Sequence, residues 1–153
     1  MLSMLFVRRV ATPLVLAASL VLGACSDDPT EPEEEPEVQS LTLTVGASSI
    51  TIDKTTGAAS GNLVVPSGTS TVTAQWKRAD GSNEALISSD DYELRIVPTN
   101  AANLTWTPGG AFGGTLVVTG LASNATTSAR VSLLHKKEQH EDFGPYTFTV
   151  RVQ

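Results

Sequence analysis

The feature that most constrains this 153-residue chain is a two-residue alternation of apolar and polar side chains after residue 40. Residues 41–45 and 146–152 show the alternation most clearly. Because successive side chains of a strand point to opposite faces of a sheet, this period predicts strands with one buried and one exposed face. A helix needs apolar residues every three or four positions, and no stretch after residue 40 sustains that spacing. We therefore expect β-structure.

Seven further segments have the composition of short strands. Gly, Pro, Asn and Asp separate them, as is typical of turns between strands, and threonine at alternate positions suits a half-exposed pleated surface. The segments are residues 50–52, 62–65, 72–77, 92–97, 103–107, 115–119 and 129–135. We predict that residues 41–153 form an all-β, antiparallel sandwich of about seven to nine strands, with a small open barrel as the alternative.

The number and spacing of these segments resemble the immunoglobulin-like modules of bacterial surface lipoproteins. The closing Phe148-x-Val150-x-Val152 segment adds to this resemblance. The disulfide of antibody domains has no counterpart, because the chain holds a single cysteine. Trp76 and Trp106 lie on predicted strands and are therefore expected to fill the core or one end of it.

Residues 1–24 have the three parts of an export signal. Arg8 and Arg9 precede an apolar run, residues 10–22, and two small residues follow it. This run is too short to span a bilayer core of about 30 Å as a helix. We therefore expect residues 1–24 to be a signal peptide.

The segment Leu22-Gly23-Ala24-Cys25 closes the apolar run and contains the only cysteine. It resembles the lipobox of bacterial lipoproteins. Membership implies cleavage before Cys25 and several acyl chains there, which anchor a protein stably in a membrane. The alternative is an ordinary cleaved signal with a chance cysteine beside it. The resemblance implies a lipid-anchored protein of the bacterial cell envelope. The residue directly after Cys25 is Ser26, with Asp27 and Asp28 only further on. Under the sorting rule of this family in enteric bacteria, that implies the outer membrane or cell surface rather than the inner membrane.

The acidic charge is concentrated just after this cysteine, in residues 25–40. The formal net charge is −6, and seven of the 16 acidic residues lie in residues 27–37. Prolines and like charges keep such a segment extended, so we expect a disordered tether; binding of Ca²⁺ or a basic partner is the alternative. Residues 39–153 carry eight basic and nine acidic residues and no basic patch, so nucleic-acid binding is not expected.

Both histidines of the chain lie between the last two predicted strands. If residues 136–139 form a hairpin loop, His135 faces His140 across the strand pair and Asp142 follows on the same face. Two imidazoles and a carboxylate suit Zn²⁺, Cu²⁺ or Fe²⁺, with Asp142 either a ligand or an orienting partner of one ring. The alternative is structural: His135 ends the core, and Asp142 holds His140 by a hydrogen bond. We therefore expect no cofactor on the structural reading, and zinc or copper if the hairpin binds a metal.

The glycine-rich residues 109–114 form a second candidate region. They precede a strand rather than a helix, so they lack the context of a phosphate loop. We expect a flexible connection that presents Phe112 to a partner or a sugar. Residues 88–91 could offer oxygens to Ca²⁺ but fit an ordinary turn.

No convergent set of nucleophile, base and acid can be assigned, so we do not expect an enzyme. The favoured function is a non-catalytic, lipid-anchored envelope or surface protein that binds an unidentified protein or glycan. The alternative is a metal-binding lipoprotein that uses His135, His140 and Asp142.

Overall fold

The computed structural model describes residues 34–153 as nine strands. The predicted signal peptide, Cys25 and the first part of the predicted tether lie outside the described residues. Each predicted strand segment corresponds to one observed strand. Within residues 34–153, no helix is long and apolar enough to span a membrane. The strands are β1 (Ser40–Val45), β2 (Ser48–Asp53), β3 (Asn62–Val65), β4 (Gly68–Lys77), β5 (Tyr92–Pro98), β6 (Leu104–Pro108), β7 (Gly113–Val118), β8 (Thr126–His135) and β9 (His140–Val152).

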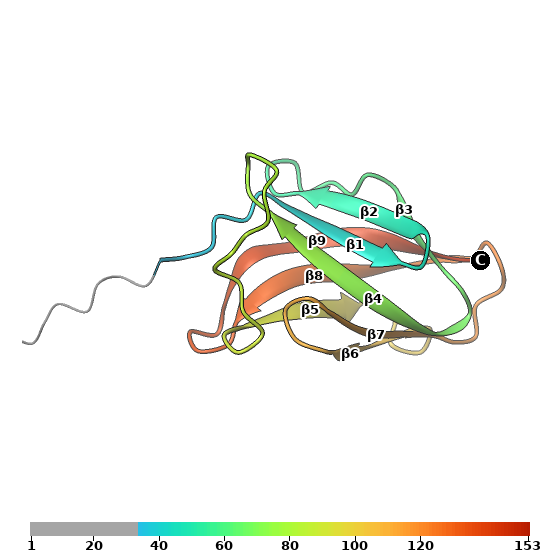
Figure 1. Cartoon of the computed structure of the whole chain (residues 1–153). Coiled ribbons are helices and arrows are strands. Elements are labelled where there is room, and N and C mark those ends of the chain that lie inside the picture. The colour runs from blue at the N-terminus through green and yellow to red at the C-terminus, as the bar shows by residue number, and fades with distance from the viewer. Residues whose placement is uncertain (1–33) are drawn as a thin grey trace, which may run out of the picture. The chain divides into compact units, whose positions relative to one another are not determined.

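The strands form two stacked layers, which confirms the predicted all-β sandwich (Figure 1). One sheet has five strands in the order β2-β1-β4-β7-β6, and the other has four in the order β3-β9-β8-β5. All neighbours are antiparallel except β3 and β9, which run parallel. This pair arises because the chain passes from β2, at the edge of one sheet, to β3, at the edge of the other.

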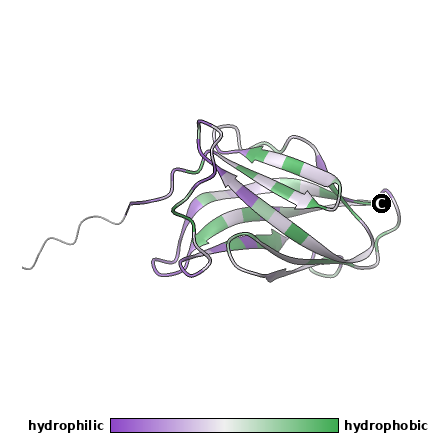
Figure 2. Ribbon diagram, viewed as in Figure 1, coloured by the Kyte–Doolittle hydropathy of each residue, from purple (hydrophilic) through white to green (hydrophobic). Residues whose placement is uncertain are grey.

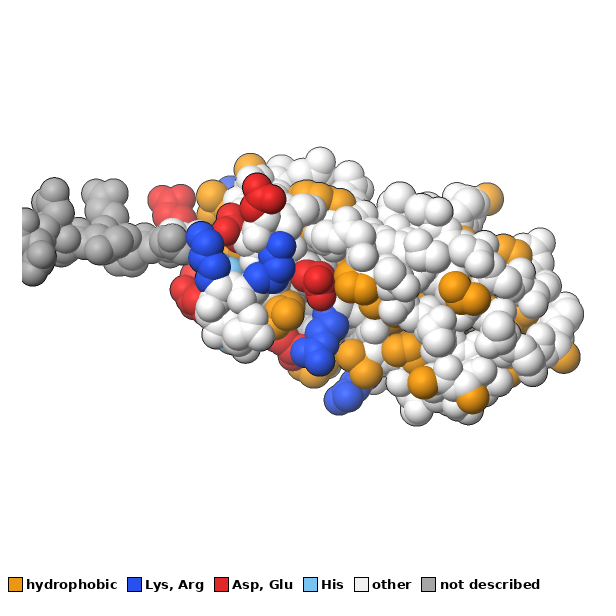
Figure 3. Space-filling view, turned by 90° about the horizontal axis from the view of Figure 1, so that it is seen from below, with side chains coloured by type: hydrophobic (Ala, Val, Ile, Leu, Met, Phe, Trp, Pro, Cys, Tyr) orange, Lys and Arg blue, Asp and Glu red, His pale blue; other side chains and the backbone are white. Residues whose placement is uncertain are grey.

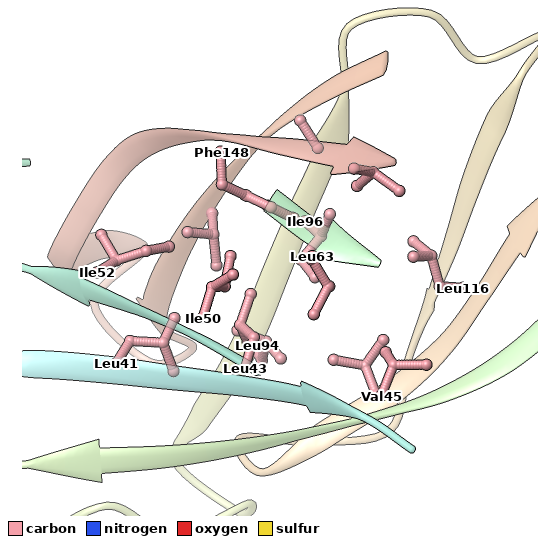
Figure 4. Packing of buried hydrophobic residues seen from close by; sticks show 14 of the residues in the cluster. Leu41, Leu43, Val45, Ile50, Ile52, Leu63, Leu94, Ile96, Leu116 and Phe148 are labelled. Atoms are coloured by element: carbon pink, nitrogen blue, oxygen red, sulfur yellow. The ribbon is translucent and has the colours of Figure 1, made fainter. Parts of the chain in front are cut away.

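The facing sides of the two sheets enclose the hydrophobic core. Alternating bands of apolar and polar residues along the strands show which face each residue takes (Figure 2). In β1, Leu41, Leu43 and Val45 are buried, whereas the residues between them are partly exposed. Phe148 of β9 packs into the same core from the opposite sheet (Figure 4). Each large side chain buried in this way contributes about 1.5–3 kcal/mol, so the alternation itself stabilises the sandwich.

Both tryptophans connect the two sheets, and Trp76 is more deeply buried than Trp106. Trp76 of β4 is 1% exposed and donates its indole N–H to the carbonyl of Ala111 at 2.8 Å. Its ring packs edge-to-face on Phe143 of β9, with centroids 5.5 Å apart, and so connects the two sheets. Trp106 of β6 is partly buried and donates to the carbonyl of Leu94 in β5 at 3.3 Å. Trp76 therefore fills the core, as predicted, whereas Trp106 packs where the edges of the sheets meet.

The packed part of the chain begins before the first strand. Pro36 and Val38 are buried, and the backbone N–H of Glu37 donates to the Glu84 carboxylate at 2.9 Å. The folded region thus starts within residues 25–40, the segment whose composition predicts a tether. Residues 25–33 lie outside the described part of the chain, whereas Val38, near the end of the segment, packs into the core.

Candidate functional site

The hairpin that joins β8 to β9 has the predicted register. His135 ends β8, His140 begins β9, and the two residues are direct partners across the pair. Gln139 adopts a positive φ of 57°, and its backbone N–H donates to the carbonyl of His135 at 2.8 Å, which closes the loop. The two imidazole rings lie side by side, with centroids 5.5 Å apart.

A bulge in β9 turns Phe143 to the same buried face as Asp142. Leu134 pairs with Glu141 and Leu133 pairs with Phe143, so the ladder passes over Asp142. In a regular strand, Asp142 and Phe143 would point to opposite faces, but an extra residue in one strand lets both turn away from solvent. The side chain of Asp142 is 7% exposed, and Phe143 is 1% exposed.

Gly144 makes room for this distortion of β9. Its φ is +88°, and a Cβ atom there would lie 2.4 Å from the carbonyl oxygen of Val131 on β8. No side chain fits into that space. Glycine at this position therefore lets β9 approach β8 closely just after the bulge.

Three side chains converge at the loop end of the hairpin. His135, His140 and Asp142 each offer one ligand atom, and these atoms all lie within 4.8 Å of one another. The Nε2 atom of His140 contacts Oδ1 of Asp142. Its other ring nitrogen, Nδ1, lies 3.1 Å from Oε2 of Glu138. The structure thus brings together the three predicted residues and adds Glu138, which the sequence placed only in the loop between the two histidines.

The site is buried on one side and open on the other. The side chain of His135 is 5% exposed, whereas that of His140 is 41% exposed. Tyr92 of β5 stacks on the His135 ring, with centroids 4.7 Å apart and an interplanar angle of 24°. Burial raises the pKa of Tyr92 to about 12, and nearby carboxylates, Asp142 foremost, add to this effect. The phenol of Tyr92 is therefore neutral over the physiological range.

Two buried polar atoms of this cluster have no hydrogen-bond partner. Among the described residues, three buried side-chain atoms lack one: Nδ1 of His135, Oδ2 of Asp142 and Oγ of Ser70. Ser70 lies on β4, away from the hairpin. An unsatisfied buried polar group costs about 1–3 kcal/mol and calls for an explanation such as a bound ion or water. Nδ1 of His135 and Oδ2 of Asp142, by contrast, both belong to the cluster at the β8–β9 hairpin.

Two lysines of the hairpin loop tie it to the turn before β5. The ammonium group of Lys137 lies 2.9 Å from the carboxylate of Asp91, and that of Lys136 donates to the carbonyl of Ser89 at 2.6 Å. The hydrogen bond from Lys137, followed by one from Ser88, lowers the pKa of Asp91. The Ser88 hydroxyl bonds to the Asp91 carboxylate at 2.9 Å. Residues 88–91 thus form a turn that holds the hairpin in place.

Phe112 lies at a second candidate surface and is 47% exposed. The backbone of this residue is fixed, because its carbonyl accepts a hydrogen bond from the N–H of Ala74 at 2.9 Å. Its ring borders a hollow of about 250 Å³ that is also lined by Gln75, Trp76 and Asn83. The glycine-rich connection therefore exposes Phe112, as expected, but its backbone is held by hydrogen bonds, whereas the sequence predicts a flexible connection.

Glu84 is a buried charged residue that the sequence did not reveal. Its side chain is fully enclosed, and Nε of Arg78 lies 3.2 Å from its carboxylate. The backbone N–H of Leu86 donates to the same group at 3.0 Å. With the N–H of Glu37, these partners make Glu84 an anchor for the start of the domain. A glutamate in a polar loop gives no sequence signal of such a role.

Charged side chains are unevenly distributed over the visible surface (Figure 3). Lys, Arg, Asp and Glu gather toward the end at which the described chain begins, while the other end carries mostly neutral polar and apolar side chains. The β8–β9 hairpin lies at the charged end (Figure 1). The histidine cluster is therefore set among charged groups of both signs.

No model of a known protein family matches this chain, and no curated protein matches its sequence. The chemistry of its own side chains is thus the basis for assigning a function.

Proposed function

We propose that this chain is a lipid-anchored, non-catalytic binding protein of the bacterial cell envelope. The observation that carries this assignment is the lipobox-like segment Leu22–Cys25, placed ahead of a domain whose packed part begins at Pro36. Residues 26–35 between them are rich in Asp, Glu and Pro, a composition that extends a chain. Cys25 is the attachment point, and the outer membrane or cell surface is the proposed location.

We assign the domain to the immunoglobulin-like sandwiches, and the strand order supports this. If β1 is strand A and β4 to β9 are strands B to G, the sheets contain the orders A-B-E-D and C-F-G. These are the orders of constant-type immunoglobulin domains, with β2 and β3 as additions. Because a fold does not determine a function, the binding surface has to be identified from its side chains.

The surface around Phe112 favours a glycan over a protein as the ligand. An exposed aromatic ring can pack against the apolar face of a sugar, while amides bond to its hydroxyl groups. Here the ring of Phe112 borders a hollow lined by the amide residues Gln75 and Asn83. A few polar groups around an apolar contact are typical of a small-ligand site.

Anchoring is tested with the full-length chain in a bacterial host supplied with a radiolabelled fatty acid. We expect wild type to carry the label and to sediment with membranes, and Cys25→Ser to do neither. Label retained by Cys25→Ser would contradict attachment at this residue. An unlabelled wild type in the soluble fraction would contradict lipid anchoring altogether.

Glycan binding is tested with the chain from Ser26 onward on a panel of envelope polysaccharides and peptidoglycan fragments. We expect Phe112→Ala to weaken binding at least tenfold. Leu86→Ala is the control, because Leu86 is also exposed, at 39%, but does not line this hollow. Absence of any bound glycan, or equal loss in both variants, would argue against this surface.

A further inference from the structure

We propose that the β8–β9 hairpin binds one divalent transition-metal ion, with Zn²⁺ as the best match. His135, His140 and Asp142 are the ligands, and Glu138 is a positioning residue. This inference goes beyond envelope attachment and does not depend on lipidation of Cys25 or on a ligand at Phe112.

The donor set selects the class of ion. Two imidazole nitrogens and one carboxylate oxygen match zinc sites with three protein ligands and one open position, whereas Ca²⁺ and Mg²⁺ prefer oxygen donors. The three ligand atoms lie within 4.8 Å of one another. Two ligands at about 2.0–2.1 Å from a tetrahedral zinc ion are roughly 3.3 Å apart. Small side-chain rotations therefore bring the three atoms to bonding distance.

The unpartnered atoms are an independent sign of a missing ligand. The side chain of His135 is only 5% exposed and its Nδ1 has no hydrogen-bond partner, and the same holds for Oδ2 of Asp142, whose side chain is 7% exposed. Oε2 of Glu138 lies 3.8 Å from Nδ1 of His135, beyond hydrogen-bond distance. A structural pairing of His140 with Asp142 uses Oδ1 alone, so Nδ1 of His135 and Oδ2 of Asp142 both stay without a hydrogen bond. Metal ligation by His135 and Asp142 compensates for the burial of these polar groups.

Glu138 gives His140 a defined orientation. Nε2 of His140 faces Asp142, while Nδ1 lies 3.1 Å from Oε2 of Glu138. A metal-bound imidazole usually donates its other N–H to a carboxylate, which fixes the ring and its tautomer. We therefore assign Nε2 of His140 to the metal and its Nδ1–H to Glu138.

The surroundings hold the ligands in place. Tyr92 stacks on His135, and the pair of Lys137 with Asp91, 2.9 Å apart, ties the loop to the turn before β5. Sites whose ligands are fixed by packing and hydrogen bonds need little rearrangement on binding. The 41% exposure of His140 leaves a path for the ion and room for a water molecule as the fourth ligand.

Isothermal titration of the chain from Ser26 onward with Zn²⁺ tests the site. This chain lacks Cys25, whose thiol binds metals itself. We expect one ion per chain, at least tenfold weaker binding by His140→Ala and by Asp142→Asn, and no binding of Ca²⁺ or Mg²⁺. Circular dichroism confirms that each variant is folded.

A neighbouring carboxylate provides the matched control for Asp142→Asn. Glu141 accepts a hydrogen bond from the Ser132 hydroxyl at 2.8 Å and lies beside Arg95, away from the histidines. Glu141→Gln changes the charge by the same amount one position away. We therefore expect its zinc affinity to stay within about twofold of wild type.

The role of Glu138 is tested by rescue. Loss of an outer partner of a metal ligand typically weakens metal binding 10- to 100-fold. We expect Glu138→Ala to weaken zinc binding at least tenfold, and Glu138→Gln, which keeps an acceptor oxygen, to recover most of that loss. Equal losses in Glu138→Ala and Glu138→Gln would remove Glu138 from this role.

Two outcomes would overturn the metal site. In the first, wild type binds no Zn²⁺, which makes the cluster a structural contact only. In the second, wild type, His140→Ala and Asp142→Asn bind Zn²⁺ equally, which places the ion elsewhere on the chain. Neither outcome bears on lipid anchoring, which is tested separately through Cys25.

Discussion

The two halves of β9 differ in the regularity of their strand geometry. From Tyr146 to Val152 the alternation is unbroken, and Phe148 and Val150 point into the core. From His140 to Pro145 the strand contains a bulge at Asp142 and a glycine with a φ of +88°. The regular half buries apolar side chains, whereas the irregular half buries a carboxylate and lies beside a buried histidine.

This difference distinguishes the residues that stabilise the sandwich from those that can form a binding site on it. Local departures from regular geometry cost free energy and persist only where the surrounding structure holds them. Such departures are expected at functional sites rather than in the core. Phe143 joins the two halves, because it follows the bulge and packs against Trp76 across the sheets. The regular half therefore stabilises the fold, and the irregular half is the place to look for binding.

The largest expected effect comes from the regular half. Phe148→Ala removes a side chain that is 2% exposed and should lower the free energy of unfolding by about 3–5 kcal/mol. Chemical denaturation measures the loss. Thr147→Ala, at an exposed neighbouring position, should change the free energy by less than about 0.5 kcal/mol. A loss below about 1 kcal/mol for Phe148→Ala would contradict this view of the core.

A smaller effect is expected where the two halves of β9 meet. Gly144→Ala places a Cβ 2.4 Å from the carbonyl oxygen of Val131 at a φ that disfavours side chains. We expect a loss of about 1–3 kcal/mol in the free energy of unfolding. Gly61→Ala is the control, because its Cβ would meet no atom within 4 Å and its φ is not in the positive region. Equal stability of the two variants would show that β9 tolerates a side chain here.

A third effect depends on pH and reports on the burial around the histidines. The pKa of Tyr92 is raised by burial to about 12, whereas an unfolded tyrosine titrates near 10. Between these values the unfolded chain loses the proton first, so stability should fall as pH rises from about 10 to 12. Tyr92→Phe keeps the ring on His135 but should show a shallower fall. Chemical denaturation at several pH values over this range measures the free energy of unfolding. If it falls with pH equally in wild type and Tyr92→Phe, Tyr92 is not the cause.

The smallest expected effect on stability comes from the exposed histidine. In metal-free buffer, His140→Ala should lower the free energy of unfolding by about 1 kcal/mol, because it removes a side chain that is 41% exposed but also the Nε2 contact of the buried Asp142 carboxylate. With Zn²⁺ in excess, wild type should melt at a higher temperature and the variant should not. A larger loss without metal, and no zinc effect on wild type, would favour the structural role.

The strands and the pairing of the two histidines could be predicted from the sequence. Each strand has an apolar alternation or a short apolar run bounded by Gly, Pro, Asn or Asp, and those signals are local. The pairing of His135 with His140 also followed from the length of a single loop. Both predictions depend only on residues close together in the chain, where strand geometry fixes the outcome.

The rest depends on contacts between distant residues. The bulge at Asp142 is set by the fit of β9 against β8, and the parallel pairing of β3 with β9 is set by the edges of two sheets. Burial of Glu84 depends on Arg78 and on the backbone of Glu37, far away in sequence. No local sequence pattern encodes such contacts. The contact of Glu138 with His140 likewise depends on the folded shape of the loop.

The most direct test is anomalous diffraction at the zinc absorption edge, from crystals of the chain grown with Zn²⁺. The central claim is that the irregular half of β9 is a ligand site supported by a regular sandwich. It predicts a single strong anomalous peak bonded to His135, Nε2 of His140 and Asp142, with Glu138 beside Nδ1 of His140. The absence of a peak there, with those side chains unchanged or the ion bound elsewhere on the chain, would contradict it.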